Sequence, residues 1–374
     1  MEKKKFAYLH DHTIFSIKDA TSSTKDYAKK INNINDTSND YIVNGFAITD
    51  HGCMFGMTNG YEDMEAVKYK NFKYIVGNEL YCVDDLNTSN LRSSEERYHL
   101  IALAKNDIGL SNLFRISSHA GMNKIKHAKK EFQITDENYV FNNCEGIIFL
   151  SACYGGKLSS LVRNNKIQEA KEYALKCKNT FDDYYIELQC LDWSEQYILN
   201  DQLVKIAKEL DIPLAITCDA HYANVEDKEY HDLMKVIDGF QGFETNNEMK
   251  APEIIEKYCI DNNIPLEAMS NTAKIAEMCN VDIKPKDPKG FMPDFPCPEG
   301  YNEESYLRKL AMEGLTWRWN NTTKRTKPFS VYLKRMYYEL DIINQMGFSG
   351  YFLILMDWCK WCRDNGILLG PGRG

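Results

Sequence analysis

The stretch Phe6-Ala-Tyr-Leu-His10-Asp-His12-Thr13 joins a short apolar run to a His-x-His pair, and Asp19 follows shortly after it. Side chains in a β-strand alternate with a period of two, so His10 and His12 are predicted to point the same way. Two imidazoles on one side of a strand end can share a metal ion. The competing interpretation is a pair of hydrogen-bonded polar residues where a strand ends, and this stretch alone leaves both open.

Short apolar runs recur along the chain and alternate with longer amphipathic stretches. This alternation predicts an α/β fold with a mainly parallel sheet. Seven runs favour a closed or nearly closed barrel, with an open doubly wound sheet as the alternative. The predicted strands are Phe6–Leu9, Gly45–Thr49, Tyr74–Val76, Leu100–Leu103, Gly146–Leu150, Tyr185–Leu188 and Leu214–Thr217. The predicted helices between them include Lys25–Ile34, Gly60–Tyr69, Gly109–Ala120, Lys157–Phe181 and Glu195–Leu210.

Side chains that can bind metals follow five of these runs. The carboxyl ends of barrel strands share one rim, where the chemistry of such folds gathers. His99 is an exception, because it precedes its apolar run, and the pattern gives no account of how it reaches that rim. The candidate ligands are His10, His12, Asp19, His51, Glu79, His99, Cys153, Asp219 and His221.

This ligand set is rich in imidazoles and carboxylates, which suits Zn²⁺, Mn²⁺ or Fe²⁺ better than Ca²⁺. Nine ligands are too many for one ion and fit two or three. Asp50, beside His51, is predicted to orient that imidazole from outside the ligand set. The remaining histidines, His119, His127 and His231, are predicted to lie on the surface of helices.

The composition is that of a large folded chain. Its 374 residues are 44% hydrophobic and 26% charged, which favours more than one domain. No stretch approaches the ~18 apolar residues of a membrane span, and the first apolar run is too short for a signal peptide, so a cytoplasmic location is expected. The 12 cysteines stand singly except for Cys359 and Cys362, which predicts reduced thiols and a structural rather than zinc-binding pair.

The charge is distributed unevenly along the chain. The net charge is −9, yet residues 301–374 carry 11 Lys and Arg against 7 Asp and Glu. An acidic body suits metal chemistry and a basic end suits phosphate contact, although a mixed solvated surface is the simpler interpretation. A stretch rich in Pro and Gly at 283–300 reads as a linker. It divides a domain at 1–282 from a helical segment at 301–374.

The candidate residues lie in motifs that resemble the PHP (polymerase and histidinol phosphatase) family. The motifs are His10-x-His12, Thr49-Asp-His51-Gly, Gly77-Asn-Glu79, Tyr98-His-Leu-Ile-Ala-Leu-Ala, Leu150-Ser-Ala-Cys153 and Asp219-Ala-His221. The sequence that flanks these motifs resembles one branch of the family more strongly still, the bacterial C-family DNA polymerase III alpha subunits. Ala47-Ile-Thr-Asp-His-Gly-Cys-Met-Phe-Gly, Ile212-Pro-Leu-Ala-Ile-Thr-Cys-Asp-Ala-His-Tyr and Gly347-Phe-Ser-Gly-Tyr-Phe-Leu-Ile resemble motifs of that subunit.

The resemblance implies a distorted seven-stranded barrel with a trinuclear metal site, followed by part of a polymerase palm. It implies hydrolysis of a phosphoester, and in the polymerase branch the removal of nucleotides from a DNA 3′ end, which is proofreading. Because every matched ligand position is filled, an active site is favoured. Two alternatives stay open, namely a scaffold that stabilises the polymerase or docks a proofreading subunit, and a small-molecule phosphatase of the histidinol-phosphatase type.

The closing Gly370-Pro-Gly-Arg-Gly374 is by itself typical of a turn. By resemblance it starts a nucleotide-phosphate loop, in which Gly372, Arg373 and Gly374 would contact phosphate. The family's polymerase aspartates, which bind Mg²⁺, would come later, so this chain is expected not to polymerise alone and to be a truncated polymerase or a piece of a split or intein-interrupted one. The partners expected by resemblance are a DNA 3′ end, the rest of the polymerase, a sliding clamp and replisome subunits in a bacterial or virus-infected cell, and no membrane.

Overall fold

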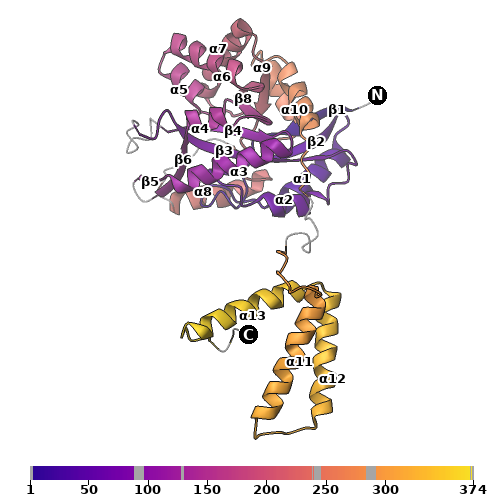
Figure 1. Cartoon of the computed structure of the whole chain (residues 1–374). Helices are drawn as coiled ribbons and strands as arrows, with labels where there is room; N and C mark the ends of the chain where they lie inside the picture. The colour runs from indigo at the N-terminus through magenta and orange to yellow at the C-terminus, as the bar shows by residue number, and fades with distance from the viewer. Residues whose placement is uncertain are drawn as a thin grey trace. The chain divides into compact units, whose positions relative to one another are not determined.

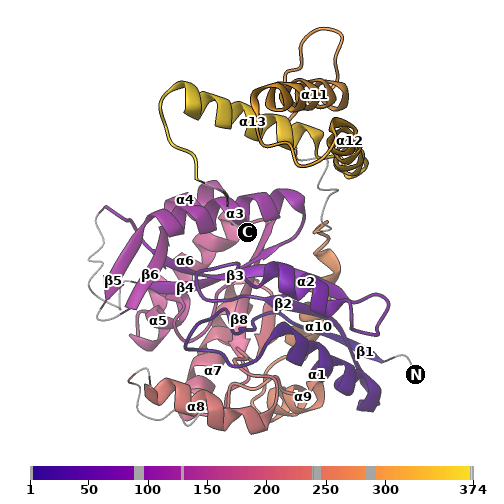
Figure 2. The ribbon, with the colours of Figure 1, turned by 90° about the horizontal axis from the view of Figure 1, so that it is seen from below.

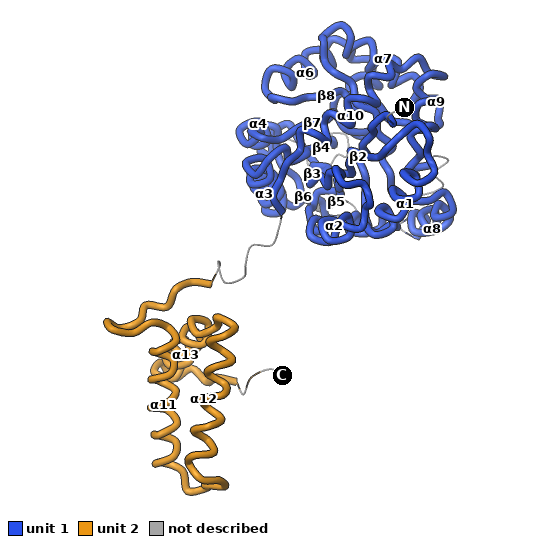
Figure 3. The backbone as a smooth tube through the Cα atoms, turned by 90° about the vertical axis from the view of Figure 1, so that its right-hand side faces the viewer, with its two compact units in different colours: residues 1–283 blue, residues 284–374 orange. Residues whose placement is uncertain are grey.

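The structure is a computed structural model that describes residues 3–87, 97–127, 130–237, 239, 246–283, 292–370 and 372, with backbone only at residues 126, 127 and 130. It consists of two compact units, residues 1–283 and 284–374 (Figure 3). Each unit is described separately below. No helix among the described residues is long and apolar enough to cross a membrane.

Unit 1 is an α/β barrel, as predicted. Seven strands follow one another around it in the order β1, β2, β3, β4, β7, β8 and β9. Neighbouring strands are parallel except on both sides of β4, which runs against the others. The seven strands are β1 (Lys4–Tyr8), β2 (Tyr41–Ile48), β3 (Lys73–Val83), β4 (Tyr98–Ala104), β7 (Ile147–Leu150), β8 (Asp183–Gln189) and β9 (Leu214–Thr217).

The ring closes just beyond the ends of its first and last strands. Asp11 and Ala220 form an isolated parallel bridge. In it the His12 N–H donates to the Ala220 carbonyl at 2.7 Å, and the Ala220 N–H donates to the His10 carbonyl at 3.2 Å. The seven strands therefore form a nearly closed barrel, whose rim at this point carries the His-x-His pair.

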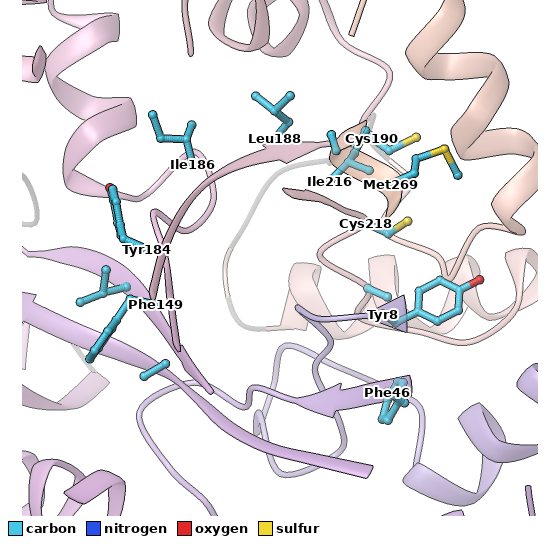
Figure 4. Close-up of a cluster of buried hydrophobic side chains, with 14 of the residues drawn as sticks. Tyr8, Phe46, Phe149, Tyr184, Ile186, Leu188, Cys190, Ile216, Cys218 and Met269 are labelled. Carbon is cyan, nitrogen blue, oxygen red and sulfur yellow. The ribbon is translucent and has the colours of Figure 1, made fainter. Parts of the chain in front are cut away.

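Helices surround the strands (Figures 1 and 2). Apolar side chains on the outer faces of the strands pack against these helices, and Figure 4 shows Tyr184, Ile186 and Leu188 of β8 in that layer. Because strand side chains alternate, Glu187 of β8 is left on the inner face. The helices are α1 (Thr24–Thr37), α2 (Met57–Met64), α3 (Asp107–Met122), α4 (Glu137–Asn142), α5 (Lys157–Arg163), α6 (Ile167–Thr180), α7 (Ser194–Leu210), α8 (Lys228–Ile237), α9 (Pro252–Asp261) and α10 (Glu267–Met278), with a 3₁₀ turn at Val225–Asp227.

A second, smaller apolar cluster fills the interior of the barrel. Ala7, Ala47, Ile75 and Ala215 face inward from four strands and meet Ile275 and Ala276 of α10. Asn271 of α10 also donates to the Leu214 carbonyl, at the first residue of β9. Helix α10 therefore closes the amino-terminal end of the barrel, which leaves the carboxyl-terminal rim as the open end.

Two features of unit 1 differ from the sequence-based prediction. A hairpin of β5 (Lys124–His127) and β6 (Lys130–Asp136) was not predicted, and β6 pairs with the end of β3. The long helix predicted over Lys157–Phe181 is two helices, α5 and α6. The break falls at Asn165, whose φ of 58° is left-handed and incompatible with a continuous helix.

Gly109 in the first turn of α3 offers a test of this packing. A Cβ at Gly109 would lie 1.7 Å from the backbone oxygen of Gly146, just before β7, so the helix or the strand would have to move. We expect Gly109→Ala to lower the free energy of unfolding by about 1–3 kcal/mol, the usual cost of overpacking. Urea titration measures it.

Gly121→Ala in the same helix is the matched control. Its Cβ would meet nothing closer than 3.8 Å, so alanine should be neutral or add up to about 1 kcal/mol through its better helix propensity. Equal effects of the two substitutions would contradict the described packing of α3 on the barrel.

The described residues of unit 2 form three helices, α11 (Glu303–Asn321), α12 (Phe329–Gln345) and α13 (Ser349–Asp364). Arg308 of α11 pairs with Asp341 of α12 at 2.8 Å. Cys359 and Cys362 lie on α13, and all 12 cysteines of the chain are free thiols. In the closing loop Gly372 has a left-handed φ of 102°, whereas Arg373 and Gly374 lie outside the described residues.

Candidate metal centre

The first pair of predicted ligands lies on the open rim, where the chain leaves β1. The side chains of His10 and His12 are fully buried and point the same way, with their Nε2 atoms 3.2 Å apart. The Asp219 Oδ1 atom, just beyond β9, lies 3.3 Å from His10 Nε2 and 3.2 Å from His12 Nε2. The segments that follow the first and last strands of the barrel therefore contribute ligands to one cluster.

Glu79 of β3 lies at the centre of the site and is fully buried. Its Oε1 is 2.8 Å from His99 Nδ1 and 3.4 Å from both Cys153 Sγ and His10 Nε2. Its Oε2 is 3.5 Å from His12 Nε2. Glu79 therefore belongs to two groups of potential ligands whose donor atoms lie within 4.8 Å of one another: His10, His12 and Glu79, and Glu79, His99 and Cys153.

A third group joins the rim beside these two. His12, His51 and His221 bring ring nitrogens within 4.8 Å of one another. Asp19 Oδ2 lies 3.1 Å from His51 Nε2, and Asp19 Oδ1 lies 3.7 Å from His221 Nε2. All nine side chains predicted as ligands are thus gathered at one end of the barrel.

The position of His99 is explained by the direction of β4. Because β4 runs antiparallel to β3 and β7, its amino-terminal end lies at the rim where the other strands have their carboxyl ends. His99 pairs with Tyr81, two residues beyond Glu79, and its backbone N–H donates to the Gly155 carbonyl at 3.0 Å. A histidine that precedes an antiparallel strand therefore reaches the same rim as a histidine that follows a parallel one.

Glu187 was missed by the sequence analysis. Its fully buried carboxylate accepts a hydrogen bond from His10 Nδ1 at 2.7 Å and another from the Thr217 hydroxyl at 2.6 Å. The bond fixes the His10 ring so that Nε2 faces Glu79 and Asp219, the usual task of a carboxylate behind a metal-bound histidine. The available signal was an acidic residue inside the apolar run Tyr185–Leu188.

This contact predicts the effect of Glu187→Gln. Glutamine keeps the volume but replaces a charged acceptor by a neutral one, so we expect metal affinity or turnover to fall about 10- to 100-fold. Metal titration of the variant against the wild-type chain measures it. Unchanged affinity and turnover would show that Glu187 does not support His10 in this way.

Asp50 acts on a different histidine from the one predicted. Its Oδ1 accepts from the Ser16 hydroxyl at 2.7 Å and from the Thr13 N–H at 2.7 Å. The Ser16 oxygen in turn accepts from His12 Nδ1 at 3.1 Å and from the His51 backbone N–H at 3.1 Å. Asp50 thus orients the His12 ring through Ser16. The same serine contacts only the backbone N–H of His51, not its ring.

The three histidines predicted on helix surfaces differ from that prediction. His231 on α8 is buried, 4% exposed, with its ring 5.7 Å from that of His221, so its prediction is wrong. His119 on α3 is half-buried and stacks on Tyr139 at 3.7 Å. His127 belongs to strand β5 rather than a helix, and its side chain lies outside the described residues.

The carboxylates of Glu79 and Asp219 are ionised, and the His12 ring is neutral. Burial opposes ionisation of Glu79, but His99 and His51 outweigh it and hold the pKa of this carboxyl well below its usual value. Burial likewise opposes ionisation of Asp219, but His10 and His12 lower its pKa. Burial, aided by His51 and His221, keeps the pKa of His12 well below its usual value, so this ring is neutral.

The protonation states of His12 and Asp219 put two hydrogen-bond acceptors face to face. The Nδ1–H of neutral His12 is used on Ser16, so its Nε2 lone pair faces the ionised Asp219. Burial opposes protonation of His51, but Tyr81 and Glu79 raise the pKa of its ring to about 10, and the ring lies 2.5 Å from Glu79 Oε2 and 3.1 Å from Asp19 Oδ2, so a metal ion bound there would take the place of its protons. Burial and nearby carboxylates also raise the pKa of the Cys153 thiol, which a metal ion would lower. The site therefore fits divalent metal ions.

A pocket of about 780 Å³ opens from this cluster. Asp19, His51, Glu79, Cys153 and Asp219 line it, so a bound molecule reaches at least one residue of each of the three groups of ligands. Its remaining lining comes from the last residue of β8 and the segments after β7, β8 and β9: Gln189, Tyr154, Leu191, Asp192, Trp193, Ser194, Glu195, His231, Lys235 and Asn247, with His99 and His221. Lys235 of α8 contacts the Asp19 carboxylate.

Comparison with known protein families identifies two domains in the chain. Residues 8–190 match the PHP domain, and residues 305–374 match the bacterial DNA polymerase III alpha NTPase domain. Residues 8–190 thus carry a PHP domain, as the motifs predicted.

Along its whole length the chain is similar to DNA polymerase III subunit alpha. It is 34% identical to that subunit of Borreliella burgdorferi, over 100% of this chain and 32% of the relative. It is 32% identical to that of Aquifex aeolicus, over 99% of this chain and 32% of the relative. The corresponding figures for Treponema pallidum are 31% identity, 100% and 31%. The chain thus spans about a third of the length of the curated relatives it matches.

Proposed function

We propose that this chain is the N-terminal portion of a replicative DNA polymerase III alpha subunit, whose barrel hydrolyses the terminal phosphodiester bond at a DNA 3′ end. On this proposal it adds no nucleotides by itself, works in the cytoplasm, and meets a primer 3′ end and the remainder of the polymerase. The observation that carries the proposal is the convergence of nine potential ligands on one rim of the barrel, seven of which line an open pocket.

The three groups of ligands would hold two or three ions of the Zn²⁺, Mn²⁺ or Fe²⁺ kind. Such ions lower the pKa of water and offset charge on a phosphate, so they supply nucleophile and electrophile together. Glu79 belongs to two groups and holds them at a fixed separation. Five of the nine ligands are imidazoles, which keeps the ligand set from becoming too anionic to admit a DNA phosphate.

Residues behind the ligands keep this arrangement rigid before substrate arrives. Glu187 fixes the His10 ring, and Ser16 with Asp50 fixes the His12 ring. Gln189 Nε2 donates to Asp219 Oδ2 at 3.1 Å and so turns Oδ1 toward the two histidines. Ligands held in this way can accept metal and phosphate without reorganising.

A 5′-labelled primer, paired or mispaired at its 3′ end, tests the proposal. Incubated with Mn²⁺ or Zn²⁺, the wild-type chain should shorten the primer stepwise. Asp219→Asn removes a charged ligand and should slow the shortening by at least about 100-fold. Metal-loaded chain that is inert on every DNA end would favour a scaffold role, and a preference for a small phosphomonoester would favour a phosphatase.

Asp211→Asn is the matched control. Asp219 and Asp211 both have a left-handed backbone, with φ of 49° and 51°, and asparagine tolerates that conformation well. Asp211 lies at the end of α7 with its side chain exposed beside Lys178, whereas Asp219 contacts His10 and His12. The control should therefore retain wild-type activity, and an equal loss in both variants would remove the support that Asp219 gives to the proposal.

A further inference from the structure

Two aromatic side chains stand together in the pocket, beside the metal ligands. Tyr154 follows Cys153 directly, and Trp193 precedes helix α7; both line the pocket. Their ring centroids are 4.8 Å apart at an angle of 48°. Both residues are partly exposed and lie outside the apolar cluster that fills the barrel, although Tyr154 also packs against the outer apolar core.

The pair is held in place without any ligand. The Arg163 guanidinium lies 3.8 Å from the Tyr154 ring centroid and donates to the Tyr154 carbonyl at 3.2 Å. The Trp193 carbonyl accepts from the N–H groups of Gln196 and Tyr197 in the first turn of α7, at 3.1 and 3.3 Å. A rigid aromatic surface loses little conformational freedom when a flat molecule stacks on it.

The charges around the pair disfavour a phosphate beside Trp193. Asp192 and Glu195 line the pocket on either side of Trp193 and are exposed. The pocket's lysine, Lys235, lies against Asp19 among the metal ligands. Two carboxylates thus flank Trp193 and one guanidinium lies on Tyr154, so an anionic group is repelled on the Trp193 side, whereas an uncharged flat ring meets no such repulsion.

We propose that Tyr154 and Trp193 form a stacking subsite for the base of the terminal nucleotide whose phosphate reaches the metal ligands. The inference rests on the proposed function and adds to it the part of the substrate that is recognised. Stacking is possible because every nucleobase has an aromatic face, and it needs that base to leave the duplex. A mispaired terminal base leaves at lower cost, so the subsite would favour mispaired ends.

The test compares two single-stranded oligonucleotides, one ending in thymidine and one ending in an abasic 3′ nucleotide. Trp193→Leu and Tyr154→Leu remove an aromatic face but keep an apolar side chain. Each should lower kcat/KM on the thymidine end by about 5- to 150-fold, the range that stacking of one base corresponds to. Trp193→Phe should restore most of the loss, and Trp317→Leu, in unit 2, should cost nothing.

The abasic end separates stacking from a structural role. On the abasic end the wild type should lose a similar factor, and the two leucine variants should lose nothing further. An equal loss by the variants on both ends, or no loss on either, would overturn the subsite.

A binding measurement keeps this inference distinct from the proposed hydrolysis. Calorimetry with metal-loaded chain compares deoxythymidine 5′-monophosphate with deoxyribose 5-phosphate, and the nucleotide should bind more tightly to the wild type but not to Trp193→Leu. If no DNA end is hydrolysed, the proposed function fails while this binding difference still decides the subsite. Equal binding of the two compounds by the wild type would refute the subsite even in an active exonuclease.

Discussion

Glu79→Gln is expected to lower hydrolysis of a DNA 3′ end by more than about 100-fold and to reduce the number of metal ions bound per chain. Glutamine keeps the shape of the side chain but removes the charge shared by two groups of ligands. Loss of a residue that merely supports a ligand costs about 10- to 100-fold, so loss of the ligand common to two groups should cost more. The primer assay and elemental analysis of the purified variant measure the two effects.

Glu137→Gln is the matched control for this substitution. Glu137 is also a buried glutamate, 7% exposed, and its carboxylate accepts from Tyr98, Lys157 and Lys176. It lies outside the three groups of ligands, so the variant should lose stability but keep its metal content. If Glu79→Gln stayed within a few-fold of wild-type activity, or if both variants lost metal equally, Glu79 would not hold the site together.

Removal of metal is expected to destabilise unit 1 strongly. Glu79, Asp219 and Glu187 are buried within one cluster, and a cation that binds only the folded state offsets their mutual repulsion. At metal concentrations of about 100 to 1,000 times Kd, each ion adds about 2.7 to 4.1 kcal/mol to the free energy of unfolding. A chelator should therefore lower the thermal unfolding temperature of the intact chain, and excess Mn²⁺ should restore it.

The Glu79→Gln variant shows whether this shift arises at the proposed site. Its metal sites are already impaired, so chelation should change its unfolding temperature much less than that of the wild type. A chelator that leaves the wild type unchanged, or shifts both proteins alike, would place any stabilising metal elsewhere.

The fold was predictable where hydrophobic pattern determines structure. Each of the seven predicted strands has a counterpart in the barrel, and Leu214–Thr217 has the same bounds in both. Strand direction is not encoded in such a pattern, so the reversal of β4 could not be foreseen. The β5–β6 hairpin was missed because its sequence is rich in Lys and polar residues, and it is stabilised by pairing with β3 rather than by apolar alternation.

The gathering of the candidate ligands was predictable because parallel strands end at the same rim. The residues that support these ligands could not be predicted. Glu187 is one charged residue in a buried strand, and only the completed barrel places it behind His10. The link from Asp50 through Ser16 to His12 joins segments 34 residues apart, and the burial of His231 depends on where α8 lies. These contacts join segments that are distant in the sequence, so local sequence patterns do not predict them.

The central claim is that the rim of the barrel holds a cluster of divalent metal ions. Anomalous diffraction from crystals of the chain soaked in Mn²⁺ tests it most directly. We predict at least two anomalous peaks, each bound by one of the three groups of ligands: His10, His12 and Glu79; Glu79, His99 and Cys153; or His12, His51 and His221. Fully soaked crystals with no peak at this rim, or with peaks only elsewhere on the chain, would contradict the claim.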